Sequence, residues 1–385
     1  MAENKLKYDT TIKFFISIIG LVFIVFILKE LSHIIIPFVV AYFLFFLYSP
    51  ISNFCEKKKF PAYLTVILEV VLTIIIAWII SSLLIGSAIQ FGNEIPGYIN
   101  KLNALVQNTA LSFGLNDPFF KEFSLQKILS NIDYKLLAGG VFTSTFSIAG
   151  NVLIVLFFFV FVFTGHKTIY AAFQKRFVNK KVEPKLNKLK TKYNSKINNS
   201  NSDFTQWMSD KYNIERNEQE EKLSNTFKAI TEQIQRYLIS KMTINLAAGI
   251  VVTIILSLFG VDFSIIWGLF VFLFNFIPAL GSTIALLLPT LMTLVQFESF
   301  GFALLIAVIL SGVQTLFFNV IEPNVLGKKL NLNPLVILLS VLAWGYVWGI
   351  VGMLLSVPLT AIINIILSNS ASKDLKFISD LMSQK

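Results

Sequence analysis

Two long apolar stretches near the C-terminal end of the chain, Ile265–Val295 and Leu335–Leu367, are interrupted by residues that break helices. The interrupting residues are Asn275, Pro278 and Gly281 in the first stretch and Gly345, Gly349 and Gly352 in the second, with Pro289 and Pro358 further along. Hydrocarbon cannot satisfy the backbone groups that a helix break leaves unpaired, so such breaks persist only where protein buries them or water wets them. Paired breaks of this kind indicate a polar site inside the membrane.

The composition places the chain in a membrane. Of its 385 residues, 55% are hydrophobic, and the mean hydropathy is +0.72. Only 14% are charged, whereas soluble domains have about 25%. We expect an all-α integral membrane protein with about 7–8 membrane segments, and each broken stretch is either a re-entrant helical hairpin or a tilted span. The other expected spans cover residues 12–28, 32–49, 62–89, 146–165, 242–259 and 300–320.

Basic residues between the apolar segments predict the orientation of the chain. If both broken stretches return to the side from which they enter, all but five of the 32 Lys and Arg lie on the cytoplasmic side, as the positive-inside rule requires. The five exceptions are Lys29, Lys101, Lys121, Lys127 and Lys135. Both termini are then cytoplasmic, and the two hairpins enter from opposite sides. Because the basic residues are spread between spans, the net charge of +10 indicates no nucleic-acid partner.

The same pattern divides the chain into regions. They are spans 1–3 (1–89), two short amphipathic helices outside (90–145), span 4 (146–165), a basic cytoplasmic region (166–241), a C-terminal membrane domain (242–370) and a cytoplasmic tail (371–385). The basic region contains a Lys/Asn-rich insert at 180–222, which we expect to be mobile or loosely helical, and an amphipathic helix after Leu223 along the inner surface. The C-terminal domain contains the broken hairpins at 263–296 and 334–367.

The residues typical of enzymes and metal sites are scarce. His33 and His166 are isolated, Cys55 is the only cysteine, and the sequence contains neither a nucleophile elbow nor a phosphate-binding loop. We therefore expect no catalytic residues, no metal site and no cofactor beyond a coupling proton or sodium ion.

Two glutamates in or beside apolar segments are candidates for such coupling, because ionisable groups at membrane depth usually face a cavity or a partner. Glu69 lies about two helical turns into the third span, where it either snorkels, pairs with Lys57–Lys59 or has a functional role. Glu322 ends the span at 300–320 and is followed by Pro323. It is either an ordinary span-ending residue or a coupling group.

The C-terminal half resembles a known family. The stretches FNFIPALGSTIALLLP and IEPNVLGKKLNLNPLVILLSVLAWGYVWGIVGMLLSVPLTAII are similar to the signature of the autoinducer-2 exporter family of bacterial membrane proteins, also called PerM-type permeases. The matching residues are Asn275, Pro278, Gly281, Pro289, Glu322, Pro323, Gly327, Pro334, Gly345, Gly349, Gly352 and Pro358. The resemblance implies a multi-pass transporter in the bacterial inner membrane. Members are associated with export of the furanone-type signal autoinducer-2, and some with sodium–proton exchange.

The sequence and the resemblance together favour a secondary transporter that exports a small polar solute by alternating access. The two broken hairpins would meet inside the bilayer and line the path. The predicted pathway residues are Asn275, Pro278, Gly281, Pro289, Glu322, Pro323, Gly327, Gly345, Gly349, Gly352, Pro358 and Glu69. A sodium (or lithium)/proton antiporter, a non-transporting membrane scaffold that recruits partners and a channel remain alternatives, and homo-oligomerisation is left open.

Overall fold

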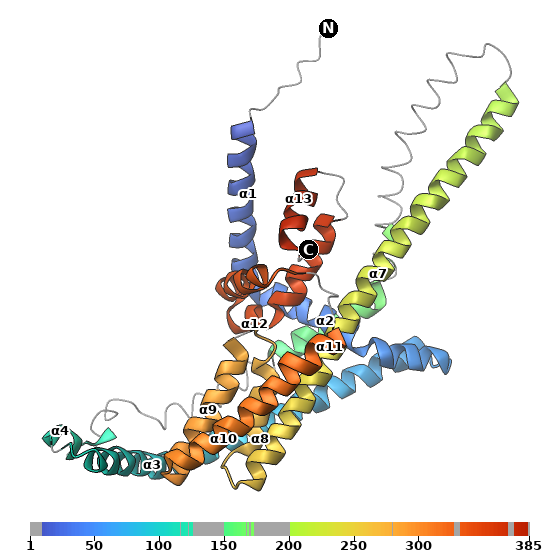
Figure 1. Cartoon of the computed structure of the whole chain (residues 1–385). Helices are drawn as coiled ribbons and strands as arrows, with labels where there is room; N and C mark the ends of the chain where they lie inside the picture. The colour runs from blue at the N-terminus through green and yellow to red at the C-terminus, as the bar shows by residue number, and fades with distance from the viewer. Residues whose placement is uncertain are drawn as a thin grey trace.

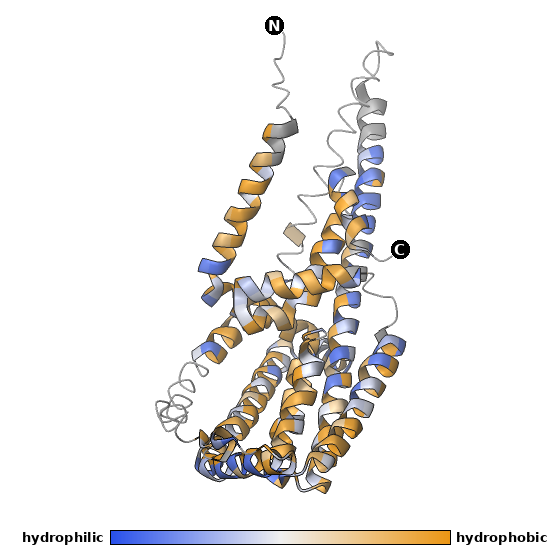
Figure 2. Ribbon diagram, turned by 60° about the vertical axis from the view of Figure 1, so that its left-hand side comes forward, coloured by the Kyte–Doolittle hydropathy of each residue, from blue (hydrophilic) through white to orange (hydrophobic). Residues whose placement is uncertain are grey.

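The computed structural model describes residues 10–115, 117–121, 123–125, 150–166, 168, 171–172, 201–278, 280–326, 332–368 and 373–383 (Figure 1). Within these ranges the secondary structure is helical, apart from one isolated bridge between Leu332 and Ser383. Six of the described helices are long and apolar enough to cross a membrane, and Figure 2 shows hydrophobic residues over most of the ribbon. The expectation of an all-α membrane protein is confirmed.

The N-terminal part begins with α1 (Thr10–Glu30), α2 (Ser32–Lys57) and α3 (Ala62–Ser112). α3 runs well beyond the expected span at 62–89, so the first of the two predicted outer helices is its continuation. The helix ends before Gly114, whose φ of 69° is a left-handed conformation that glycine adopts readily. The short helix α4 (Pro118–Lys121) follows. Beyond Leu125, the second predicted outer helix lies outside the described residues.

A further apolar helix, Gly150–His166, corresponds to the fourth expected span. Its Phe159 is fully buried in a cluster with Ala41 and Tyr48 of α2. The partly buried Val70 and Leu72 of α3 pack against the same cluster. This helix, α2 and α3 therefore share one apolar core.

The longest element, α7 (Asn201–Leu258), is one continuous helix that projects to the upper right of Figure 1. It joins part of the predicted insert, the predicted surface helix and the span at 242–259. Its N-terminal half is polar (Figure 2), and ion pairs one turn apart support the helix there. These pairs are Arg216–Glu220 at 2.8 Å and Lys222–Glu218 at 3.6 Å. Residues 201–222 are thus regular helix, and the helix after Leu223 continues straight into the span instead of forming a separate element.

The first broken stretch is a helical hairpin. It consists of α8 (Ser264–Phe274) and α9 (Leu280–Phe297). Its tip is tight, because a Cβ on Gly281 would lie 1.7 Å from the carbonyl oxygen of Phe274. Its two ends lie side by side, because Gln296 Oε1 accepts the backbone N–H of Asp262 at 2.8 Å and Gln296 Nε2 donates to the carbonyl oxygen of Gly260 at 2.9 Å. The stretch therefore returns to the place where it starts, as a re-entrant hairpin does.

The second broken stretch, α12 (Pro334–Ser368), also folds back on itself. Gly349 has φ 63° and ψ −142°, which is not helical and turns the chain. The indole N–H of Trp344 donates to Thr360 Oγ1 at 3.2 Å. A straight helix would hold these two residues about 24 Å apart. The bend at Gly349 is therefore sharp enough to bring the two arms of α12 together.

The C-terminal helix α13 (Lys373–Met382) holds the two ends of α12. The backbone N–H of Asn333, at the start of α12, donates to the carbonyl oxygen of Met382 at 2.8 Å. At the other end, Ser379 Oγ donates to Asn364 Oδ1 at 2.7 Å. Both ends of α12 thus meet at α13, so the second stretch is also a closed hairpin.

One helix lies between the hairpins in sequence, and it changes type along its length. It consists of α10 (Phe300–Gln314), the π-helix η1 (Thr315–Ile321) and α11 (Glu322–Leu326). The expected span at 300–320 is present, but its apolar pattern did not predict the π-helical segment.

The two hairpins start from opposite ends of the apolar half of α7. Near one end, Ser257 Oγ lies 2.7 Å from Ser264 Oγ at the start of α8. Toward the other end, Leu238 is buried against Leu332 and Val357 of the second hairpin region. The helix between Leu238 and Leu258 is about 30 Å long, which is the thickness of a bilayer core. This arrangement agrees with the predicted entry from opposite sides.

The hairpins do not pack extensively against each other in the described structure. α7 packs against α8 of the first hairpin and against α12 of the second. α8 approaches α7 closely, since a Cβ on Gly268 would lie 2.5 Å from the carbonyl oxygen of Gly249. The expectation that the hairpins meet directly is not matched by extensive packing between them among the described residues; both pack against α7 instead.

Candidate functional site

A buried ion pair joins α7 to α11. Lys241 Nζ lies 2.6 Å and 2.7 Å from the two carboxylate oxygens of Glu322, and the two side chains are 7% and 20% exposed. The ammonium group also lies 5.4 Å from the ring centroid of Phe318. A buried charge is strongly disfavoured without a partner, so each residue of this pair stabilises the other in place. Glu322 is therefore more than an ordinary span-ending residue.

The π-helix positions Glu322. Residues Thr315–Ile321 are π-helical, and Glu322 is the next residue in the chain. A π-turn contains more residues than an α-turn, so it rotates the side chains that follow relative to those of α10. Segments of this kind often occur at functional sites. Here the segment ends where Glu322 meets Lys241 across the helix interface.

The tip of the first hairpin lies one helical turn further along α7. Asn245 is fully buried, and its Nδ2 donates to the carbonyl oxygen of Phe272 at 3.2 Å, near the end of α8. Its Oδ1 has no hydrogen-bond partner among the described residues. Gln314 Oε1, at the end of α10, is likewise buried without a partner in the described structure. Such atoms favour a water or a hydroxyl-bearing ligand beside them.

Asn275 stabilises the hairpin tip itself. Its Nδ2 donates to the carbonyl oxygen of Val271 at 2.7 Å, and its Oδ1 accepts from Ser282 Oγ at 2.8 Å. Only 3% of the residue is exposed. Both polar groups of Asn275 are thus engaged within the hairpin in this conformation, whereas Asn245 keeps a free acceptor.

The predicted glycines and prolines fall into separate places. Pro278 and Gly281 form the first tip, and Pro289 is buried inside α9. Pro323 is exposed in α11, next to Glu322 in the chain, and Gly327 lies outside the described residues. The structure therefore does not bring the predicted pathway residues into one cluster.

The glycines of α12 surround the second tip, and Pro358 is buried in the returning arm. A Cβ on Gly352 would lie 2.0 Å from the carbonyl oxygen of Trp344, and one on Gly345 would lie 2.9 Å from the side chain of Met353. The indole N–H of Trp348 donates to the carbonyl oxygen of Leu28 at 2.9 Å. The second tip thus contacts the end of α1, far from the first tip in sequence and in packing.

Glu69 occupies a third place, between α2 and α3. It is fully buried, and Ser52 Oγ donates to its Oε1 at 2.6 Å. Lys57, Lys58 and Lys59 are exposed. The expectations that Glu69 snorkels or pairs with these lysines are wrong, because a hydroxyl group from α2 reaches the carboxylate inside the helix interface.

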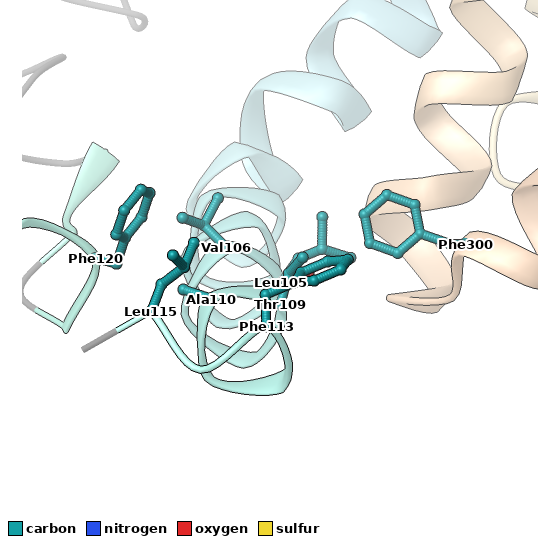
Figure 3. A pocket seen from close by; sticks show the side chains of 8 residues that line it. All are labelled: Leu105, Val106, Thr109, Ala110, Phe113, Leu115, Phe120 and Phe300. Carbon is teal, nitrogen blue, oxygen red and sulfur yellow. The ribbon is translucent and has the colours of Figure 1, made fainter. Parts of the chain in front are cut away.

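An apolar pocket lies between the C-terminal part of α3, the short helix α4 and the start of α10 (Figure 3). Its lining residues are Leu105, Val106, Thr109, Ala110, Phe113, Leu115, Phe120 and Phe300. Thr109 is the only polar residue in this lining, so the pocket does not suit a polar solute.

Lys241 is the functional candidate that the sequence pattern did not reveal. Asn245 and Gln314 are polar residues within apolar stretches of the sequence, whereas Lys241 directly precedes the expected span at 242–259, where a flanking lysine is common. Its spacing of four residues from Asn245 was the available signal, since residues four apart share one face of a helix. Among the described residues, no group of three His, Cys, Asp or Glu is arranged to hold a metal ion.

The sequence pattern that defines the AI-2E family transporters matches residues 14–372 of this chain. The chain belongs to this family. A provisionally named transport protein of Haemophilus influenzae is 27% identical over 372 residues, which cover 96% of this chain and 95% of that protein. Membership establishes a role in membrane transport and a multi-pass membrane protein.

Two other relatives of this AI-2E family transporter match over a shorter length. The AI-2 transport protein TqsA of Escherichia coli K12 is 39% identical over 140 residues, or 36% of this chain and 40% of TqsA. A provisionally named transport protein of Borreliella burgdorferi is 38% identical over 141 residues, and the match spans 39% of that protein. These relatives are named as transport proteins, in agreement with a non-enzymatic role.

Proposed function

We propose that this AI-2E family transporter exports a small polar solute across the bacterial inner membrane by alternating access. The observation that carries this proposal is the buried Lys241–Glu322 pair, one helical turn from the free acceptor Asn245 Oδ1. The opposed hairpins support it, because two hairpins that start from opposite ends of one membrane-long helix suit a site that opens to either side in turn.

The solute class follows from the unpaired acceptors. Asn245 Oδ1 and Gln314 Oε1 are buried acceptors with no partner in the described structure, so they favour a ligand that carries hydroxyl groups. Autoinducer-2 is rich in hydroxyl groups, and one relative is named as an AI-2 transport protein. We therefore choose autoinducer-2 as the first solute to test.

The ion pair acts as the inner gate in this mechanism. With both termini on the cytoplasmic side, as the distribution of Lys and Arg predicts, the pair lies between Asn245 and the cytoplasm. While Lys241 and Glu322 are joined, α7 and α11 stay closed around the site. Separation of α11 from α7 would break both hydrogen bonds between Lys241 and Glu322 and hydrate the two charges. The site would then open toward the cytoplasm.

The test is flux of autoinducer-2 through the full-length protein in liposomes, loaded on one side and assayed on the other. Asn245→Leu removes the free acceptor at similar volume, and we expect flux at least tenfold below that of the native protein. Thr243→Val is the matched control, since Thr243 lies on the same helix but is exposed. Equal flux in native protein, in Asn245→Leu and in protein-free liposomes would contradict the proposal.

The same liposomes separate the alternatives. A sodium/proton antiporter would move protons on addition of sodium without autoinducer-2, as a pH-sensitive dye would report. A channel would give flux that does not saturate with solute concentration. A scaffold would give neither signal.

A further inference from the structure

The carboxyl group of Glu69 is isolated from every positive charge in the described structure. It lies in α3, about 10 Å along the axis from the start of the helix at Ala62. No part of it is exposed, and Ser52 Oγ on α2 is the hydrogen-bond donor to Oε1. Among the described residues, Oε2 has no hydrogen-bond partner, and the ion pairs do not include Glu69.

The groups around Glu69 are neutral. Tyr48 on α2 is an ionisable residue close enough to interact with it, and the Tyr48 hydroxyl lies 2.8 Å from Thr73 Oγ1. Thr73 Oγ1 in turn donates to the backbone carbonyl oxygen of Glu69. The helix Gly150–His166 contributes the buried Phe159 to the adjoining cluster. Among the described residues, this environment provides one hydroxyl donor and no compensating charge for a carboxylate.

An unpaired carboxylate in such a place is far more costly than a neutral carboxyl group. Removing an ion from water without a counter-ion carries a large desolvation cost even after relaxation, whereas a neutral carboxyl group with one missing hydrogen bond loses far less. Glu322 differs, because Lys241 compensates its charge at 2.6 Å. The two glutamates that looked equivalent in the sequence are thus in opposite electrostatic situations.

We propose that Glu69 is a proton-binding site, which carries a proton on its carboxyl group in this conformation and releases it to water when α2 and α3 separate. The inference rests on the proposed function in one respect, because it names the proton as the ion whose movement is coupled to solute export. It assigns the binding of this coupling ion to Glu69 instead of Glu322. The step is a proton transfer: the carboxyl O–H bond breaks, its electron pair stays on the carboxylate, and a water molecule takes the proton.

α2 connects this site to the gate. Ser52 of α2 contacts Glu69, while Phe43 and Phe46 of the same helix pack against the cluster that contains Tyr237 and Leu238 of α7. Lys241 lies one turn beyond Tyr237 on α7. A displacement of α2 relative to α3 therefore acts both on the hydration of Glu69 and on the helix that carries the gate lysine.

The direct test is infrared spectroscopy of the full-length protein in lipid at neutral pH. A protonated carboxyl group has a C=O stretch that is separate from the carboxylate bands, and it shifts on exchange into D₂O. We expect this band in the native protein and its loss in Glu69→Gln, which is nearly isosteric with the neutral acid. Glu56→Gln is the matched control, since Glu56 is an exposed glutamate of α2, and it should retain the band.

A second variant keeps the carboxyl group and changes its hydrogen bond. Ser52→Ala should retain the band but move its frequency, because Ser52 Oγ contacts Glu69 Oε1. This result does not depend on the folding of Glu69→Gln. Absence of the band from the native protein, or a carboxylate signal that responds to sodium and not to pH, would overturn the proposal.

Flux in liposomes then tests the coupling separately. A pH gradient should stimulate autoinducer-2 flux through the native protein and the Glu56→Gln control. It should not stimulate flux through Glu69→Gln, which should still carry out exchange down a solute gradient. The infrared result needs no transported solute, so failure of the proposed function would leave the proton-binding assignment standing, and the reverse also holds. Persistent stimulation in Glu69→Gln would overturn the coupling role.

Discussion

Replacing Glu322 by leucine should destabilise the protein more than replacing Lys241 by methionine, although both changes break the same ion pair. The difference follows from exposure, since the Lys241 side chain is 7% exposed and that of Glu322 is 20% exposed. Glu322→Leu leaves a buried ammonium without a partner, which costs about 3–5 kcal/mol. Lys241→Met leaves a carboxylate that water reaches in part, so we expect about 1–3 kcal/mol.

The double variant Lys241→Met/Glu322→Leu should recover most of this loss. Apolar replacement of a whole buried ion pair is often neutral or stabilising, so the double variant should lie within about 1 kcal/mol of the native protein. Its flux, in contrast, should not recover, because it has lost the gate. This opposite response of stability and flux separates a gate from a structural ion pair.

The assay is the free energy of unfolding from denaturant titration in mixed micelles, followed by tryptophan fluorescence. Glu218→Gln is the control, since the Glu218–Lys222 pair lies on the same helix with side chains 58% and 70% exposed. It should change stability by less than about 0.5 kcal/mol. If the two single changes at the buried pair were equally small, or if their effects added in the double variant, the argument from burial would be refuted.

Three further changes test the hairpins by the same titration. Gly349→Ala should lower the free energy of unfolding by about 1–3 kcal/mol from backbone strain alone, since a Cβ there meets open space. The control Gly312→Ala, near the end of α10, should be neutral or slightly stabilising, and equal effects of the two changes would contradict the reasoning. Gly281→Ala should lower the free energy of unfolding by about 1–3 kcal/mol or more and expose the first tip to hydrogen exchange, because the added Cβ meets the backbone of Phe274. Unchanged hydrogen exchange at the tip would contradict the tight turn. Gln296→Ala should lower the free energy of unfolding by about 1–3 kcal/mol and raise the hydrogen-exchange rate at the backbone N–H of Asp262. An exchange rate there equal to that of the native protein would show that other contacts hold the two ends of the first hairpin together.

Local features of the sequence were sufficient to predict the broken helices. Proline and glycine act on the backbone beside them, so the interruptions near Pro278 and at Gly349 follow from the residue types at those positions. The continuity of α7 was not predicted, because the polar composition around 201–222 suggests weak order while the paired charges one turn apart favour a helix. The π-helix at 315–321 has no comparable local signature.

Partners between distant segments could not be predicted in the same way. Lys241 and Glu322 are separated by 81 positions, and Ser52 and Glu69 by 17 across a turn. From sequence, Glu69 has three basic neighbours at Lys57–Lys59, and Glu322 has two at Lys328 and Lys329. Helix packing reverses this expectation, since it buries Glu69 away from its lysines and gives Glu322 a lysine from α7.

The sequence by itself determined that this chain is a helical membrane protein with two interrupted hairpins, because hydrophobicity and backbone preference are properties of single residues and their neighbours. Only the tertiary structure decided which glutamate is paired and which is isolated, and that both hairpins pack against α7. The energy of a charge depends on the groups within a few ångströms of it, and in a folded chain those groups come from distant positions in the sequence.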